Sequence, residues 1–165
     1  MFDDHIATFK YLLCHKWYVF KAGRIIGAPL WSLIVHDASK FLPSEWSAYV
    51  HTFRNPDGSK KKYAETQEFL EAWNKHQKRN KHHWQWHVLT MDSGLIVPLR
   101  MGDDDVREMV ADWIGANFAI NGRDGFNVWA WYDINREKIL LHPDSRALAE
   151  RVLDAMAILN IKNYL

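Results

Sequence analysis

The stretch "AWNKHQKRNKHHWQWH", residues 72–87, places four of the chain's nine histidines within twelve positions. It belongs to a helical pattern that runs from about residue 63 to about residue 89. On a helical wheel one narrow stripe collects Phe69, Trp73, His76, Asn80, His83 and His87. Because the first two are typical core residues, the stripe predicts that the polar residues after them also face the interior.

Buried polar side chains must find partners, at a cost of about 1–3 kcal/mol for each one left without. Several of them on one stripe therefore indicate either a hydrogen-bonded network or a metal site. A single histidine that faces inward is more often an ordinary core residue with a hydrogen-bond partner than a metal ligand. His82 lies about 100° from the stripe, and it would replace His83 if the helix broke near Asn80.

The rest of the chain also has helical periodicity, and Phe2, Ile6, Phe9 and Leu13 define the first such pattern. We expect helices over residues 3–22, 29–40, 44–53, 63–89, 103–120 and 142–160, with a short helical or irregular piece over 128–138. Asp144 is the expected N-cap of the last helix. No alternating strand pattern of useful length is found. The predicted fold is all-α, a compact bundle of about six or seven helices.

Composition limits the class of protein. A chain of 165 residues, 48% of them hydrophobic, is long enough for one packed domain over 1–165, with 126–165 as a C-terminal packing element. The 21 basic and 20 acidic residues nearly balance, which disfavours general attraction to nucleic acid or anionic membranes. A single cysteine, the absence of a signal-peptide pattern and the absence of a long apolar run predict a cytoplasmic protein without a membrane partner.

A second chemical signal lies in "LIVHDASKF", residues 33–41, where His36 precedes Asp37 and Lys40 follows one turn later. One nitrogen and one oxygen ligand suit divalent ions such as Mn²⁺, Fe²⁺ or Zn²⁺. His15, among apolar helical neighbours, and Asp112, in "EMVADWIGA", are further candidates. If each were considered without the other candidates, His15 would be interpreted as a core histidine and Asp112 as a surface acid.

The order of these elements, His15, His36-Asp37, the cluster over 76–87 and then Asp112, resembles the HD-domain superfamily of metal-dependent phosphohydrolases. "HDASK" is similar to that superfamily's HD-x-x-K signature. The chain resembles still more closely a phage and bacterial family without an assigned activity. The shared motifs are His15-Lys16, residues 19–23 and 36–41, His76, residues 80–84, Glu108-Met109, Asp112-Trp113 and residues 141–146.

The resemblance implies an HD-domain-like helical bundle that holds one or two divalent ions of Mn, Fe, Zn or Mg. The implied metal ligands are His15, His36, Asp37, His76, His83 and Asp112. The residues assigned to a second metal or to the pocket lining are His82, His87 and Asn80. A second metal would need Asp37 as a bridge. In the HD superfamily the later histidines commonly sit on separate helices, and here they are clustered.

The predicted function is a phosphohydrolase that acts on a nucleotide or a small phosphorylated metabolite. Asp37 would orient or deprotonate a metal-bound water, and Lys40 would pair with the phosphate. Arg79, Lys81 and Trp84 are the expected substrate contacts, although packing is the more common role for such a tryptophan.

Two alternatives stay open: an HD-fold diiron oxygenase, which needs two irons and four histidines, and a non-enzymatic phage or bacterial binding protein with a structural or degenerate metal site. A phage-encoded chain would act in the host cytoplasm. The basic runs 60–62 and 78–81 permit contact with nucleic acid. However, a short lysine run is usually a solvated loop, and the chain has no groove-reading motif.

Overall fold

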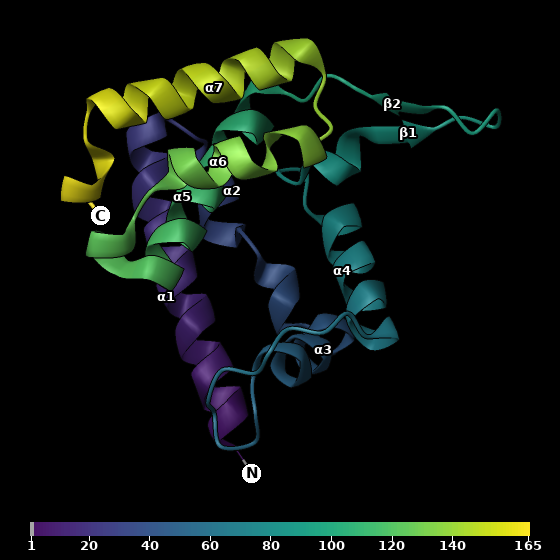
Figure 1. Cartoon of the computed structure of the whole chain (residues 1–165), viewed down its shortest axis with the longest axis vertical. Helices are drawn as coiled ribbons and strands as arrows, with labels where there is room; N and C mark the ends of the chain where they lie inside the picture. The colour runs from purple at the N-terminus through teal and green to yellow at the C-terminus, as the bar shows by residue number, and fades with distance from the viewer. Residues whose placement is uncertain (1) are drawn as a thin grey trace.

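The computed structural model describes residues 2–165 and confirms the all-α prediction (Figure 1). Within this part of the chain there are seven α-helices, joined by short 3₁₀ turns and one small hairpin. The elements are α1 (Asp3–Ile26), α2 (Leu30–Val35), η1 (Ala38–Phe41), α3 (Pro43–Phe53), α4 (Gln67–Arg79), η2 (Trp84–His87), β1 (Val88–Thr90), β2 (Ile96–Pro98), α5 (Asp103–Gly125), α6 (Val128–Asn135), η3 (Arg136–Lys138), α7 (Pro143–Ile158) and η4 (Ile161–Asn163).

The two longest helices, α1 and α5, pack against each other and make the most extensive contact between any two elements of the described residues. Gly115 of α5 permits this approach, because a Cβ atom there would lie 2.6 Å from the backbone nitrogen of Val19 on α1. Val110, Ile114 and Leu153 are fully buried beside this contact, where α7 crosses α5. The α1–α5 pair is therefore the framework on which the site residues of both helices are placed.

The packed face of α1 differs from its most apolar stripe. Ile6, Phe9 and Leu13 are exposed, whereas Leu12, His15 and Val19 are buried against the other helices. The stripe that predicts the helix therefore points outward. Although α1 is 24 residues long, no helix in the described part of the chain combines the length and the apolar character needed to cross a membrane.

The prediction of a single helix over 63–89 is wrong, because α4 ends at Arg79. Asn80 has an extended backbone, and its side-chain amide donates to the carbonyl of His76 at 2.8 Å. The same carbonyl also accepts the backbone N–H of Asn80 at 3.2 Å. Side-chain bonds of this kind are how asparagine competes with a continuing helix. At the other end Thr66 caps α4 through the backbone nitrogen of Phe69.

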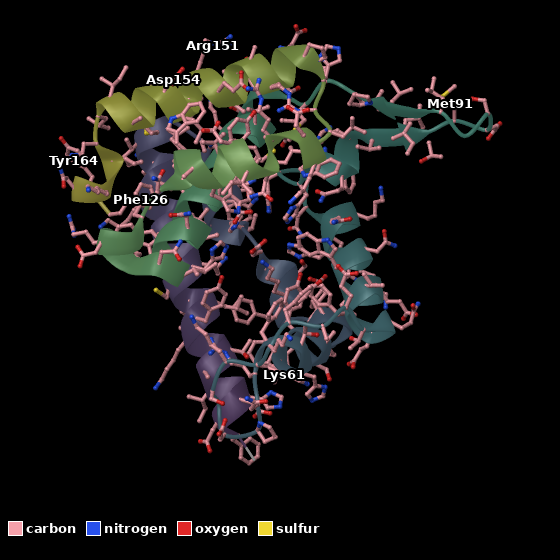
Figure 2. All side chains as sticks on the ribbon, viewed as in Figure 1. Lys61, Met91, Phe126, Arg151, Asp154 and Tyr164 are labelled. Atoms are coloured by element: carbon pink, nitrogen blue, oxygen red, sulfur yellow. The ribbon has the colours of Figure 1, made fainter. Side chains whose placement is uncertain are left out.

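A small antiparallel hairpin comes after η2, with Val88 opposite Pro98 and Thr90 opposite Ile96. No pattern in the sequence predicts this hairpin. Each strand has only three residues, which is too short to show alternation in sequence. The hairpin projects away from the helices (Figure 1), and Met91, labelled in Figure 2, lies close to its tip.

The last helix begins at Pro143, and its N-cap is His142. The Nδ1 atom of His142 accepts a hydrogen bond from the backbone nitrogen of Asp144 at 3.2 Å. Asp144 lies in the first turn, where its negative charge is favourable beside the helix N-terminus. The assignment of Asp144 as the N-cap is therefore wrong by two positions.

Candidate metal centre

Four buried or nearly buried side chains from three parts of the chain meet between α1 and α5. They are His15 of α1, His36 and Asp37 of the turn after α2, and Asp112 of α5, and we call them the first ligand group. Their facing Nε2 and carboxylate oxygen atoms are separated by 3.1 to 3.6 Å. Ligands bound about 2.1 Å from one tetrahedral ion lie about 3.4 Å apart. The spacing therefore fits a single divalent ion.

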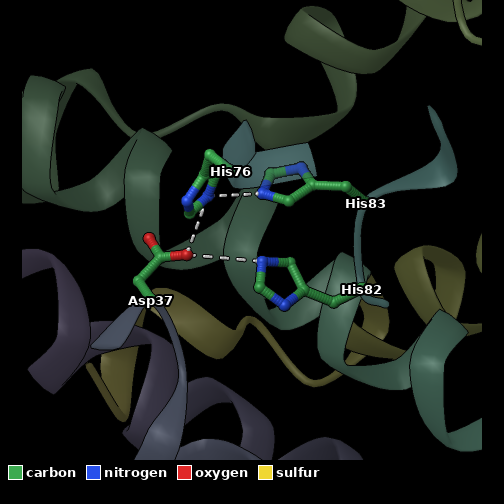
Figure 3. A group of neighbouring side chains, drawn as sticks. All are labelled: Asp37, His76, His82 and His83. Atoms are coloured by element: carbon green, nitrogen blue, oxygen red, sulfur yellow. Dashed lines mark hydrogen bonds and ion pairs between the residues drawn. The ribbon is translucent and has the colours of Figure 1, made fainter. Parts of the chain in front are cut away.

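A second ligand group lies directly beside the first and consists of Asp37, His76, His82 and His83 (Figure 3). The Oδ1 atom of Asp37 lies 3.2 Å from Nε2 of His76 and 3.4 Å from Nε2 of His82. The Nε2 atoms of His83 and His76 are 2.8 Å apart. One carboxylate and three imidazoles therefore converge, which is a donor set for zinc, iron or manganese.

Asp37 belongs to both groups, and its two oxygen atoms divide between them. Oδ2 faces His15 and His36, while Oδ1 faces His76 and His82. The backbone of Asp37 is left-handed, with φ 55°, a conformation that aspartate adopts more readily than most residues. This turn allows two consecutive side chains, those of His36 and Asp37, to belong to the same ligand group, and we call the two ligand groups together the metal centre. Lys40 also contacts Oδ2 of Asp37.

Two further carboxylates hold the histidine rings from behind. Oε1 of Glu108 lies 2.9 Å from Nδ1 of His36 and 3.0 Å from Nδ1 of His82. Glu45 lies 2.9 Å from Nδ1 of His76 and is itself held by Arg79 at 2.7 Å. A carboxylate on Nδ1 accepts its proton and leaves the Nε2 lone pair free for a metal. All three rings therefore present Nε2 to the centre.

Neither Glu45 nor Glu108 is among the site residues predicted from the sequence. A signal for Glu108 was present, because it lies one helical turn before Asp112 and must share its face of α5. Glu45 comes after the His36-Asp37 pair in the first turn of α3, and no periodicity marks it as fully buried. Only the folded arrangement brings its carboxylate to His76.

The charges at the centre call for cations. Four carboxylates are gathered there, from Asp37, Glu45, Glu108 and Asp112, and Lys40 and Arg79 offset two of them. Two negative charges are left for protons or metal ions, because uncompensated charge is costly away from water. In addition, the buried atoms Oδ1 of Asp37 and Nε2 of His82 have no hydrogen-bond partner. Metal ions bound there would balance the two negative charges and give both of these buried atoms a partner.

The same charges shift the pKa values of the centre. Burial lowers the pKa of His36, but Asp37, Asp112 and Glu108 outweigh burial and raise it to about 9. Burial raises the pKa of Glu108, and its hydrogen bonds from His36 and His82 bring it down to about 2. Burial and the neighbouring His82 hold the pKa of His83 well below its usual range. The cluster is therefore poised to exchange histidine protons for metal ions.

The structure gathers His15, His36, Asp37, His76, His82, His83 and Asp112 into the two groups. His87 lies outside them, with Nε2 2.9 Å from the carbonyl of Lys81. The amide of Asn80 is bonded to Ser39 and to the His76 carbonyl. The Lys81 ammonium lies 6.0 Å from the ring centre of Trp86.

A cavity of about 540 Å³ opens onto the centre and touches His82, His83 and Asp112. Its wall is aromatic and amide-rich, with Trp73, Trp84, Trp113, Trp131, Asn117 and Asn121. Such a pocket is the right size for a small organic ligand, and flat rings favour aromatic groups. Trp84, one of the residues predicted to contact substrate, therefore lines a cavity that reaches both ligand groups.

A family model described as "Family of unknown function (DUF5662)" matches residues 4–155, which include every residue of the two ligand groups. None of the curated proteins and none of the solved structures compared with the chain matches it.

Proposed function

The chain belongs to the family of unknown function DUF5662, and we propose that it is a phosphohydrolase with a centre for two divalent metal ions. The observation that carries the proposal is the division of the Asp37 oxygens between two complete sets of ligands. Paired metal sites that share a carboxylate are well suited to displacement reactions at phosphorus. The order of ligands along the chain adds support, because it resembles that of HD-domain phosphohydrolases.

The first ligand group would hold one ion and the second group the other, with Asp37 between them. When bound, such ions lower the pKa of coordinated water and polarise a phosphoryl oxygen. Glu108 would fix the rings of His36 and His82, and Glu45 that of His76, so the ligands are oriented before an ion arrives.

Lys40 would supply a fixed positive charge to the substrate phosphate. Burial lowers its pKa, but Asp37 outweighs burial, raises that pKa and keeps the ammonium protonated. Its contact with Oδ2 of Asp37 sets it at the edge of the first ligand group. The organic part of the substrate would enter the tryptophan-lined cavity, where an aromatic base could stack and displace water. A nucleotide has both the phosphate that would pair with Lys40 and the aromatic base that would enter the cavity.

A diiron oxygenase is the second candidate, and the histidine content of the centre favours it. The two groups together contain five histidines, three of them in the second group. Nitrogen-rich ligation with carboxylates suits iron as well as manganese or zinc. The identity of the bound metal separates the two candidates, because an oxygenase needs redox-active iron in both sites.

The test combines metal analysis with a substrate screen. Mass spectrometry of the native protein should find about two divalent ions per chain. Incubation with Mn²⁺ should then release phosphate from at least one nucleotide or phosphorylated metabolite. Asp37→Asn, which preserves the size and the left-handed backbone, should abolish release, whereas the exposed control His51→Gln should not. Two irons with an iron EPR signal and no phosphate release would favour the oxygenase.

Retention of metal without any turnover, together with unfolding on chelation, would point instead to a structural metal in a binding protein. A chain that binds no divalent ion after gentle purification would contradict all of these proposals.

A further inference from the structure

A second cavity, of about 470 Å³, is lined by Lys40 and by residues of α1, α3, α5 and the loop that follows α3. It adjoins the first ligand group at two points. Lys40 lines the cavity and contacts Oδ2 of Asp37, and the lining residue Tyr11 stacks on His15 with ring centres 6.2 Å apart. Ile120 lines both this cavity and the tryptophan-lined one. A ligand in the second cavity would therefore lie beside two residues that contact the first ligand group, although none of the proposed metal ligands lines the cavity itself.

The wall of this cavity is strongly basic. Lys40, Arg54, Lys60 and Lys61 line it, and no carboxylate does. In the described part of the chain, no carboxylate lies within salt-bridge distance of Arg54, Lys60 or Lys61. The Lys61 ammonium donates instead to the carbonyl of His51 at 2.9 Å. The cavity thus carries positive charge that the protein itself does not neutralise.

The loop that carries three of these cations is held in place. Arg54 and Lys60 form an isolated backbone bridge, which sets them opposite each other. Gly58, with φ 81°, packs against the first turn of α1, where a Cβ atom would lie only 2.8 Å from the carbonyl oxygen of Asp3. Figure 2 marks Lys61 on this loop, between the N-terminal half of α1 and α3. The sequence reads this segment as a solvated loop, and the structure places it on a cavity.

Two buried hydroxyls in the same wall lack partners. Thr8 is 5% exposed and Tyr49 is 7% exposed, and neither Oγ1 of Thr8 nor the Tyr49 hydroxyl has a hydrogen-bond partner. Buried hydroxyls without partners are unusual in folded proteins and call for an explanation. Both line the basic cavity, where each could donate to an oxygen atom of an anion.

We propose that this cavity is a subsite for the phosphate chain of a substrate that carries two or more phosphates. Hydroxyl donors beside three unneutralised cations suit phosphate oxygens. The cations extend from Lys40, which is largely buried beside Asp37, to Lys60 and Lys61, which are exposed. The three positive charges that the protein does not neutralise exceed the charge of about −2 that one phosphate carries. This proposal rests on the proposed phosphohydrolase function and narrows its substrate to nucleoside di- or triphosphates or similar compounds.

The test measures binding independently of turnover, by isothermal titration calorimetry on the chain of 165 residues as purified. The probe is the magnesium complex of tripolyphosphate, whose chelating oxygens are already occupied, and orthophosphate is the comparison. The double variant Arg54→Gln/Lys60→Gln should weaken tripolyphosphate binding at least tenfold. The matched control Lys62→Gln, an exposed lysine of the same run that does not line the cavity, should change it less than twofold.

A second variant tests the hydroxyls without removing charge. Tyr49→Phe should leave the melting temperature equal or higher, because the hydroxyl has no partner to lose. It should nevertheless weaken tripolyphosphate binding severalfold. A merely structural role of Tyr49 would lower the melting temperature and leave binding unchanged.

Equal affinity in the wild type and the double variant would overturn the subsite, as would an equal loss in the Lys62→Gln control or binding of orthophosphate as tight as that of tripolyphosphate. The proposed function fails by a different result: tripolyphosphate binding that depends on Arg54 and Lys60, with no phosphate released from any nucleotide in the presence of Mn²⁺. That result would leave a polyphosphate-binding protein.

Discussion

The Oε1 atom of Glu108 lies 2.9 Å from Nδ1 of His36, although 72 residues separate the two along the chain. The same oxygen lies 3.0 Å from Nδ1 of His82. Because His36 belongs to the first ligand group and His82 to the second, one carboxylate orients a ring in each. Asp37 contributes one oxygen to each ligand group, and Glu108 contacts the Nδ1 atoms on the far side of one ring from each group.

The first prediction concerns the contacts of Glu108 with His36 and His82. In Glu108→Gln a neutral amide oxygen replaces the charged oxygen that accepts from both rings, so the bonds that orient His36 and His82 are both weakened. Substitution of such partners commonly costs a factor of about 10–100 in metal affinity. We expect a loss of this size at one site or both, measured by competition with a chelator of known affinity. Glu71→Gln, on the exposed face of α4, is the control. Unchanged affinity would show that Glu108 does not orient the ligands.

The second prediction separates the two sites. Asp112 serves only the first ligand group, and His83 serves only the second. Asp112→Asn and His83→Gln should therefore each lower the metal content from about two ions per chain to about one. Elemental mass spectrometry measures the stoichiometry directly. Loss of both ions from either variant would mean that the sites fill together, and loss of neither would remove that residue from the ligand set.

The third prediction concerns pH and the metal-free protein. Neighbouring carboxylates raise the pKa of His36 to about 9, against an ordinary value of about 6.5. A raised histidine pKa contributes stability that is complete below the unfolded pKa and is lost as the pH rises through the folded one. The chelated protein should therefore lose thermal stability between about pH 6.5 and pH 9.

The metal-loaded protein should behave differently over that range, because its ions require unprotonated Nε2 atoms and replace the protons. Metal binding at pH 7 should also release protons, which calorimetry in buffers of different ionisation enthalpy would detect. A chelated protein whose melting temperature stayed constant or rose from pH 6.5 to pH 9 would contradict this account of the cluster.

The histidine stripe illustrates how far the sequence predicts the site. The helical wheel correctly turns His76 inward, because it lies within α4. Beyond Arg79 the period fails, since the Asn80 side chain ends the helix and the chain after it takes a new direction. His82 and His83 therefore both enter the cluster, while His87 turns to the Lys81 carbonyl. A period of 3.6 residues describes only a continuous helix.

Other parts of the site depend on distances that no local pattern contains. Glu45 meets His76 across 31 residues, and Thr8 lines one cavity with Lys60. Such contacts arise from the packing of α1, α3 and α4, which composition and periodicity leave undefined. The His36-Asp37 pair was the more predictable element, because two ligand types at adjacent positions are visible without any knowledge of packing.

The fourth prediction concerns the contact that aligns the helices. A Cβ atom on Gly115 would lie 2.6 Å from the nitrogen and 2.9 Å from the Cα of Val19, so α1 and α5 must separate in Gly115→Ala. Overpacking of this kind commonly costs about 1–3 kcal/mol. Because His15 lies one turn before Val19 and Asp112 lies just before Gly115, the separation should also widen the 3.1 Å contact between His15 and Asp112.

Gly23→Ala on α1 is the matched control, because the atoms its Cβ would meet belong to the Leu33 side chain rather than to the backbone. Urea unfolding should show a loss of stability in Gly115→Ala, and metal analysis should show a weakened first site with the second site retained. Gly23→Ala should lose stability by repacking Leu33, yet keep both ions. If Gly115→Ala bound both ions with wild-type affinity, close approach of α1 and α5 would not be what sets the first ligand group.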